Sequence, residues 1–117
     1  MKYMLLIYGP ESPNMPDPAE LAPMMEAYTN YGKAIADAGV YVTGDALQGR
    51  ASATTVTVDD GGSRLVTDGP FAETREVLGG YYVLDVPDLD AALDWAARCP
   101  GSRNGGTVEV RPIREFS

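Results

Sequence analysis

GYYVLDVPDLDAALDWAARCP, residues 80–100, decides the fold, because an apolar strand is followed at once by a capped helix. Gly80–Val86 is the predicted strand. Asp88 is the predicted N-cap of a helix that reaches Cys99, and Pro100 ends it. The apolar face of this helix consists of Leu89, Ala92, Leu93, Ala96 and Cys99.

The N-terminal half repeats this order of strand and helix. Lys2–Tyr8 is apolar on both alternating faces, which predicts a central strand. A helix is expected from the Asp17 N-cap to about Ala38, with a kink or a separate first turn at Pro23. Its sheet-facing stripe consists of Leu21, Met25, Tyr28, Gly32 and Ile35, and Val40–Thr43 follows as a second strand.

A β-hairpin separates the two units. Ala53–Val58 and Arg64–Thr67 are rich in β-branched residues and flank an Asp-Gly turn, and Thr107–Ile113 is the last strand. The order predicts an α+β, ferredoxin-like βαββαβ fold with an inserted β-hairpin, formed by residues 1–117 as a single domain.

Both helices of such a fold lie on one face of the sheet. We expect the bare face to carry Tyr3, Leu5 and Ile7, and a second copy related by a two-fold axis to cover it. The expected assembly is therefore a homodimer that forms a dimeric α/β barrel.

Composition excludes several classes of function. The net charge of −8 argues against nucleic acid, and no segment is long and apolar enough for a membrane or a signal peptide, so we expect a cytoplasmic protein. With one cysteine and no histidine, a transition-metal site is not expected, although an all-oxygen site for Mg²⁺ or Ca²⁺ stays open. We expect no cofactor.

DGPFAETREVLGGYY, residues 68–82, holds the candidate site. Gly69 and Pro70 favour a turn that brings the Asp68 carboxylate to a strand end. In a functional interpretation, Asp68 and Glu73 line a pocket and Arg75 binds an anion. In a purely structural interpretation, Asp68 caps backbone N–H groups, Phe71 fills the core and Arg75 pairs with an acid across the dimer.

Two further features flank this segment. Five tyrosines offer hydroxyls to a polar ligand, although packing is the commoner role of such residues: Tyr8, Tyr28, Tyr31, Tyr81 and Tyr82. Tyr8 and Tyr82 are the expected exceptions, because they neighbour the loop. Gly79-Gly80 precedes a strand instead of opening a helix, so a bulge or a close chain approach is favoured over a phosphate loop.

The motif also carries a family resemblance. Asp68-Gly-Pro-Phe71 with Ala72–Glu76 and Leu78–Tyr82 resembles the signature of the DGPF-domain group of YCII-related proteins, and the resemblance extends over essentially the whole chain. It implies a dimeric α/β barrel with a ligand pocket near the loop. Some relatives are thought to use a His and Asp pair, and without histidine the imidazole position falls to Tyr28.

Two functions follow as hypotheses. The first is a small-molecule-binding or regulatory domain with its pocket at the Asp68-Gly-Pro-Phe loop, and the resemblance implies a link to extracytoplasmic-function sigma factors. The second is a cofactor-independent enzyme, such as a lyase, an isomerase or a dehydrochlorinase-like catalyst, with Asp68 as general base. The absence of histidine favours the first.

Overall fold

A computed structural model describes residues 1–10, 18–69 and 76–116. The predicted order of elements is confirmed, with two short 3₁₀ helices in addition. In chain order they are β1 (Lys2–Pro10), α1 (Pro18–Asp37), β2 (Tyr41–Ala46), η1 (Arg50–Ser52), β3 (Thr54–Val58), β4 (Arg64–Asp68), β5 (Glu76–Asp85), α2 (Leu89–Arg98), η2 (Pro100–Ser102) and β6 (Thr107–Pro112).

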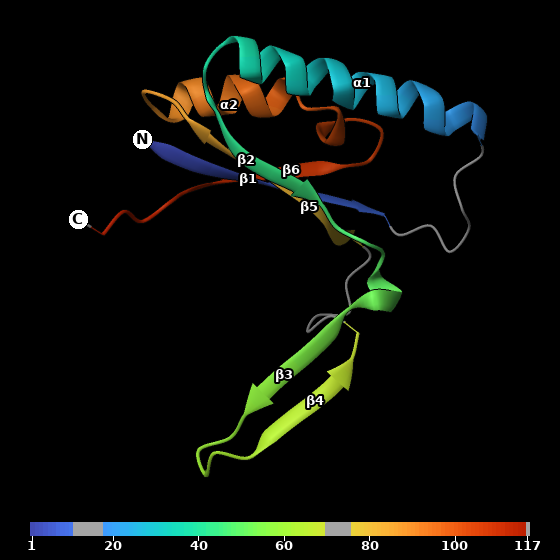
Figure 1. The fold of residues 1–117 in the computed structure, drawn as a ribbon, viewed down its shortest axis with the longest axis vertical. Coiled ribbons are helices and arrows are strands. Elements are labelled where there is room, and N and C mark those ends of the chain that lie inside the picture. Colours follow the sequence, from blue (N-terminus) through green and yellow to red (C-terminus); the bar gives the residue numbers. More distant parts are fainter. Residues whose placement is uncertain (11–17, 70–75, 117) are drawn as a thin grey trace.

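Four strands form one antiparallel sheet in the order β2-β5-β1-β6. This is the ferredoxin-like order, in which the strand of each βαβ unit is separated from its partner by a strand of the other unit. β1 lies inside the sheet, as its apolar sequence predicts. Both helices cover the same face, while β3 and β4 form a separate hairpin that extends away on the other side (Figure 1).

The core lies between the helices and the sheet. Leu5 of β1, Leu84 of β5 and Ile35 of α1 are fully buried there. Burial of each such side chain stabilises the fold by about 1.5–3 kcal/mol. The buried cluster consists of Tyr3, Leu5, Tyr31, Ile35, Leu84, Val86, Ala92, Ala96 and Cys99.

The predicted orientation of β1 is wrong. Tyr3 and Leu5 belong to the core beneath the helices, and Ile7 packs against it, so these residues do not form the bare face. Both alternating faces of β1 are apolar, and a strand with two apolar faces carries no signal for which one a helix covers.

The opposite side of the sheet is called the open face here, because none of the described elements covers it. Register places Met4 beside Val83 and Leu6 beside Tyr81 on this face. Its apolar centre is bordered by an Asp45–Tyr81 hydrogen bond of 2.8 Å on the β2 side and a Glu109–Arg111 ion pair of 3.7 Å on β6.

α1 differs from its predicted stripe. Met25 is 59% exposed, whereas Tyr31 is buried and donates a hydrogen bond of 2.8 Å to the Trp95 carbonyl oxygen. The first turns of α1 extend past the end of the sheet (Figure 1), and residues 22–27 of the helix are exposed. The helix is continuous through Pro23, so the predicted separate first turn is not found.

α2 begins as predicted, since the Asp88 carboxylate accepts a hydrogen bond of 2.9 Å from the Ala91 amide. On its predicted apolar face, the small residues Ala92, Ala96 and Cys99 are buried, whereas Leu89 and Leu93 are 47% and 46% exposed. Among the described residues, no helix combines the length and the apolar character needed to cross a membrane.

Gly79 forms a bulge in β5, which is one of the two alternatives predicted for Gly79-Gly80. Ile7 pairs with Gly80 and Tyr8 pairs with Leu78, so Gly79 is the extra residue. A Cβ on Gly80 would approach the Asp45 carbonyl oxygen to 3.0 Å, which shows that β2 comes close at this point.

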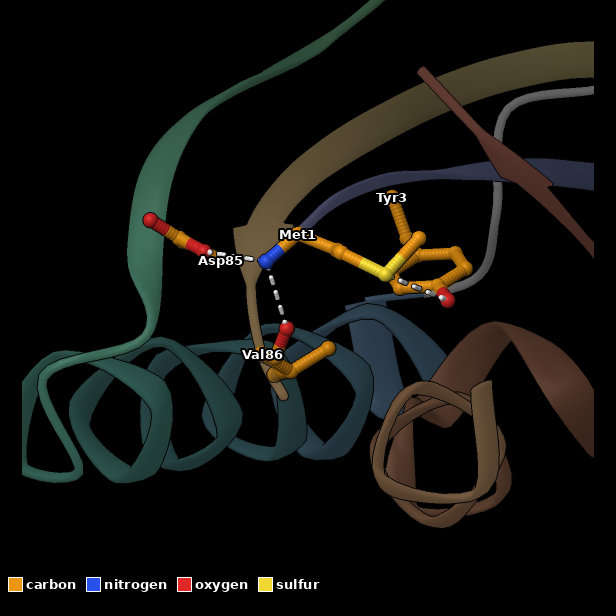
Figure 2. Close-up of polar contacts among 4 residues, drawn as sticks. All are labelled: Met1, Tyr3, Asp85 and Val86. Carbon is orange, nitrogen blue, oxygen red and sulfur yellow. Dashed lines mark hydrogen bonds and ion pairs between the residues drawn. The ribbon is translucent and has the colours of Figure 1, made fainter. Parts of the chain in front are cut away.

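The amino terminus is fixed to the end of β5 (Figure 2). The Met1 ammonium group donates to the Asp85 carboxylate at 3.1 Å and to the Val86 carbonyl oxygen at 2.9 Å. The Tyr3 hydroxyl contacts the Met1 sulfur at 3.9 Å. Because Met1 and Asp85 are well exposed, this ion pair stabilises the fold only weakly.

Candidate functional site

Tyr28 and Tyr82 are brought to the same side of the sheet. Tyr28 precedes Tyr31 by three residues and Ile35 by seven, which places it on the buried stripe of α1. Tyr82 lies opposite Leu5 of β1 in the register of β5. Both tyrosines are half-buried and pack against the same core cluster, so two of the predicted ligand contacts lie on the helix side of the sheet.

Three aromatic rings, called the aromatic wall here, pack against one another at this site: Tyr31, Tyr82 and Trp95. The rings of Tyr31 and Tyr82 meet edge to face at 5.4 Å, and those of Tyr31 and Trp95 do so at 6.3 Å. The Arg98 guanidinium lies 4.4 Å from the centre of the Trp95 ring. Tyr31, for which a packing role is predicted from the sequence, contacts both of the other rings.

The hydroxyls of Tyr28 and Tyr82 differ from that of Tyr31. The Tyr31 hydroxyl is satisfied by the Trp95 carbonyl oxygen. Within the described residues, neither Tyr28 nor Tyr82 makes a side-chain hydrogen bond, and no buried side-chain oxygen is left unsatisfied. Their hydroxyls are therefore available to solvent or to a ligand.

Two glycines make room for these side chains. A Cβ on Gly44 of β2 would lie 2.7 Å from Cδ1 of Tyr82, and a Cβ on Gly101 of η2 would lie 2.8 Å from the Tyr28 hydroxyl and overlap Ile7. Larger residues would displace the tyrosines. In a sequence, a glycine of this kind indicates that another chain segment comes close. Only the structure shows which segment it is.

Burial keeps the hydroxyls of Tyr28 and Tyr82 and the thiol of Cys99 protonated. It raises the pKa of Tyr28 to about 12, with smaller contributions from Cys99 and Tyr82, and it raises the pKa of Tyr82 as well. Burial also raises the pKa of the Cys99 thiol, against a lowering effect of a Gly101 backbone hydrogen bond. At neutral pH the site thus offers neutral hydroxyls and no thiolate nucleophile.

Tyr8 lies elsewhere. It is paired with Leu78 and Thr107, next to Ile7 in β1, and therefore projects from the open face, opposite the side of Tyr28 and Tyr82. The structure does not bring Tyr8 together with the other two tyrosines.

Asp68 ends β4, and its side chain is exposed, with no hydrogen bond or ion pair to the described part of the chain. Gly69 has φ of 100°, a conformation that favours glycine. The Gly69 amide donates to the Ala53 carbonyl oxygen at 2.7 Å, and its carbonyl oxygen accepts from the Thr55 hydroxyl at 2.5 Å. Backbone bonds therefore hold the base of the hairpin closed beside Asp68.

The rest of the predicted loop lies outside the described residues, namely Pro70, Phe71, Glu73 and Arg75. Among the residues that are described, no group of three or more His, Cys, Asp or Glu side chains is arranged to hold a metal ion.

Comparison with known proteins places the chain in a family without assigning an activity. The family model of the YCII-related domain matches residues 1–117. The chain is also 47% identical over 53 residues to the uncharacterized protein R00369 of Rhizobium meliloti (strain 1021). That match covers 44% of this chain and 43% of the relative, so it spans less than half of the relative's length.

Proposed function

We propose that this chain, which belongs to the YCII-related family, is a small-molecule-binding or regulatory domain whose ligand contacts Tyr28 and Tyr82. The observation that supports this most is a pair of half-buried hydroxyls without a hydrogen-bond partner in the described residues, next to an aromatic wall. Apolar walls with few polar groups are typical of ligand sites.

The chemistry of these groups favours an uncharged ligand at this position. A neutral tyrosine hydroxyl both donates and accepts hydrogen bonds, and the edge of the aromatic wall suits a planar or apolar part. Asp68 ends the hairpin strand β4, which extends from the side of the sheet opposite the helices, so contacts from Asp68, Gly69 and Arg75, including an anion at Arg75, are proposed separately from the tyrosine site.

The proposal includes a homodimer that forms through the open face. Met4 and Leu6, which are partly exposed, flank the buried Val83 at the apolar centre of this face, and a second copy is the simplest cover for it. Membership of the DGPF-domain group, a cytoplasmic location and a link to a sigma factor stay predictions.

The alternative is a cofactor-independent enzyme with Asp68 as general base. A base of this kind is normally set in an apolar environment that opens to the substrate, whereas the Asp68 side chain is exposed at the end of β4. This arrangement favours the binding function. If a bound molecule is converted on incubation, Asp68→Asn should abolish the conversion and leave the fold intact.

Native mass spectrometry of the purified protein tests the proposal, followed by denaturing analysis of what it releases. We expect a dimer that carries a defined small molecule. Removing one hydroxyl, as in Tyr28→Phe or Tyr82→Phe, should weaken the retention of that molecule by about 2- to 10-fold, as expected for one hydrogen bond of about 0.5–1.5 kcal/mol.

Tyr3→Phe is the matched control, since it also removes a tyrosine hydroxyl but in the core beside Met1. It should retain the molecule as the unmodified protein does. A protein that carries no molecule, or a Tyr28→Phe/Tyr82→Phe double variant that retains it unchanged, would contradict the proposed site.

A further inference from the structure

β3 and β4 form a two-stranded ribbon, called the arm here (Thr54–Asp68), that makes no sheet with the rest of the described chain. Its register is regular, from Thr54 opposite Asp68 to Val58 opposite Arg64. Figure 1 shows the arm extending away from the body, on the side of the sheet opposite the helices. The arm therefore projects on the same side as the open face.

One face of the arm carries three valines, together with Arg64 opposite Val58 and Asp68 opposite Thr54 at the base of the arm. Val56 lies directly opposite Val66, and Val58 follows on the same face because side chains alternate along a strand. These three valines are 56%, 55% and 58% exposed. The other face carries three threonines and only one large apolar residue; it consists of Thr55, Thr57, Leu65 and Thr67.

An arm of this kind is not stable by itself. Isolated two-stranded hairpins are marginal in water, and exposed apolar strands invite pairing with other chains. The dimensions of the molecule agree, since its radius of gyration is 16.3 Å against about 13 Å for a compact chain of this length. The extended shape follows from the projection of the arm away from the body (Figure 1).

We infer that the arm packs its Val56, Val58 and Val66 face on a second copy of this chain. This rests on the proposed homodimer. Two copies that meet through their open faces place each arm alongside the partner, because the arm extends on that same side (Figure 1). Two-fold symmetry then covers both arms at once, which a single copy cannot do for itself.

The packing of the arm on a second copy, called the clasp here, also concerns the candidate site. β4 ends at Asp68, and the base of the arm is closed by the hydrogen bonds of Gly69 with Ala53 and Thr55. An arm held by the partner therefore holds Asp68 in position. The position of Asp68 therefore depends on whether the dimer forms.

Hydrogen exchange at two protein concentrations tests the inference, with the oligomer measured by light scattering on the same samples. In the dimer, the amides of 54–58 and 64–68 should exchange at least about tenfold more slowly than in the diluted monomer, because the clasped ribbon no longer opens locally.

The variant Val56→Thr/Val66→Thr keeps side-chain shape and strand preference while it removes two of the three valines of this face. It should lose the protection of the arm. The matched control, Thr57→Val/Thr67→Val, makes the reverse exchange on the other face and should keep the protection.

The outcomes separate this inference from the proposed dimer. A dimer whose arm amides exchange as fast as in the monomer overturns the clasp and leaves the dimer standing. A protein that is monomeric at every concentration overturns both. Equal loss of protection in the two double variants would also contradict a specific role for the valine face.

Discussion

The sheet-and-helix body and the arm are both built on paired antiparallel β-strands, but they are stabilised differently. In the body, Leu5, Ile35 and Leu84 are fully buried between two layers. In the arm, every residue of β4 is exposed, and Val56 of β3 is 56% exposed. Both regions satisfy backbone hydrogen bonds, but only the body has a core. The difference shows that strand pairing alone does not indicate where stability resides.

The largest expected effect comes from a cavity in the body. Leu84→Ala should lower the free energy of unfolding by about 2–5 kcal/mol, because the residue is fully buried beside Leu5 and Ile35. Urea denaturation followed by circular dichroism measures this. Leu65→Ala in the arm is the control, and since Leu65 is 64% exposed its effect should stay within about 0.5 kcal/mol. Equal effects would erase the distinction between the two regions.

Overpacking at the tyrosine site should have the next largest effect. Gly44→Ala places a Cβ 2.7 Å from Tyr82 and 2.9 Å from the Tyr81 carbonyl oxygen, so we expect a loss of about 1–3 kcal/mol in thermal or urea unfolding. Gly49→Ala meets no atom within 4 Å and should be neutral or stabilise by up to about 1 kcal/mol. If Gly44→Ala matches the control, Tyr82 is not held against β2.

Alkaline pH should weaken the body through its buried phenols. The pKa of Tyr28 is raised from 10.0 to about 12, so the unfolded chain loses this proton first as the pH rises. The unfolded state then binds fewer protons, and stability should fall between about pH 10 and pH 12 while it is unaffected below pH 10. Denaturant unfolding at stepped pH measures this. Tyr28→Phe should reduce the slope, and an unchanged slope would contradict the burial of this hydroxyl.

The smallest effect is expected at the amino terminus. Asp85→Asn removes the ion pair with the Met1 ammonium group, whose two partners are 64% and 57% exposed. The cost should be at most about 0.2–1 kcal/mol in urea unfolding, and it should shrink in high salt. A loss of several kcal/mol would mean that this contact is shielded from solvent.

Part of the candidate site could be predicted from the sequence and part could not. Tyr28 and Tyr82 were named, and the structure places them together because helical and strand periodicity put each on the core side. Tyr8 is grouped with them in the sequence interpretation because it is expected to neighbour the loop, yet the alternation of β1 turns it to the open face. Tyr31 has the packing role that is predicted for it, although its contacts with Tyr82 and Trp95 could not be predicted, because nothing local distinguishes it from its neighbours.

The sequence by itself determined the ferredoxin-like order, the inserted hairpin, the Asp88 cap and the central position of β1. Caps, turns and apolar periodicity act over a few residues, so they can be read from the chain. Only the tertiary structure decided which face of β1 the helices cover, which tyrosines meet, and that the arm lies apart from the body. These properties depend on contacts between residues that are distant in sequence, and an apolar pattern on both faces of a strand leaves them open.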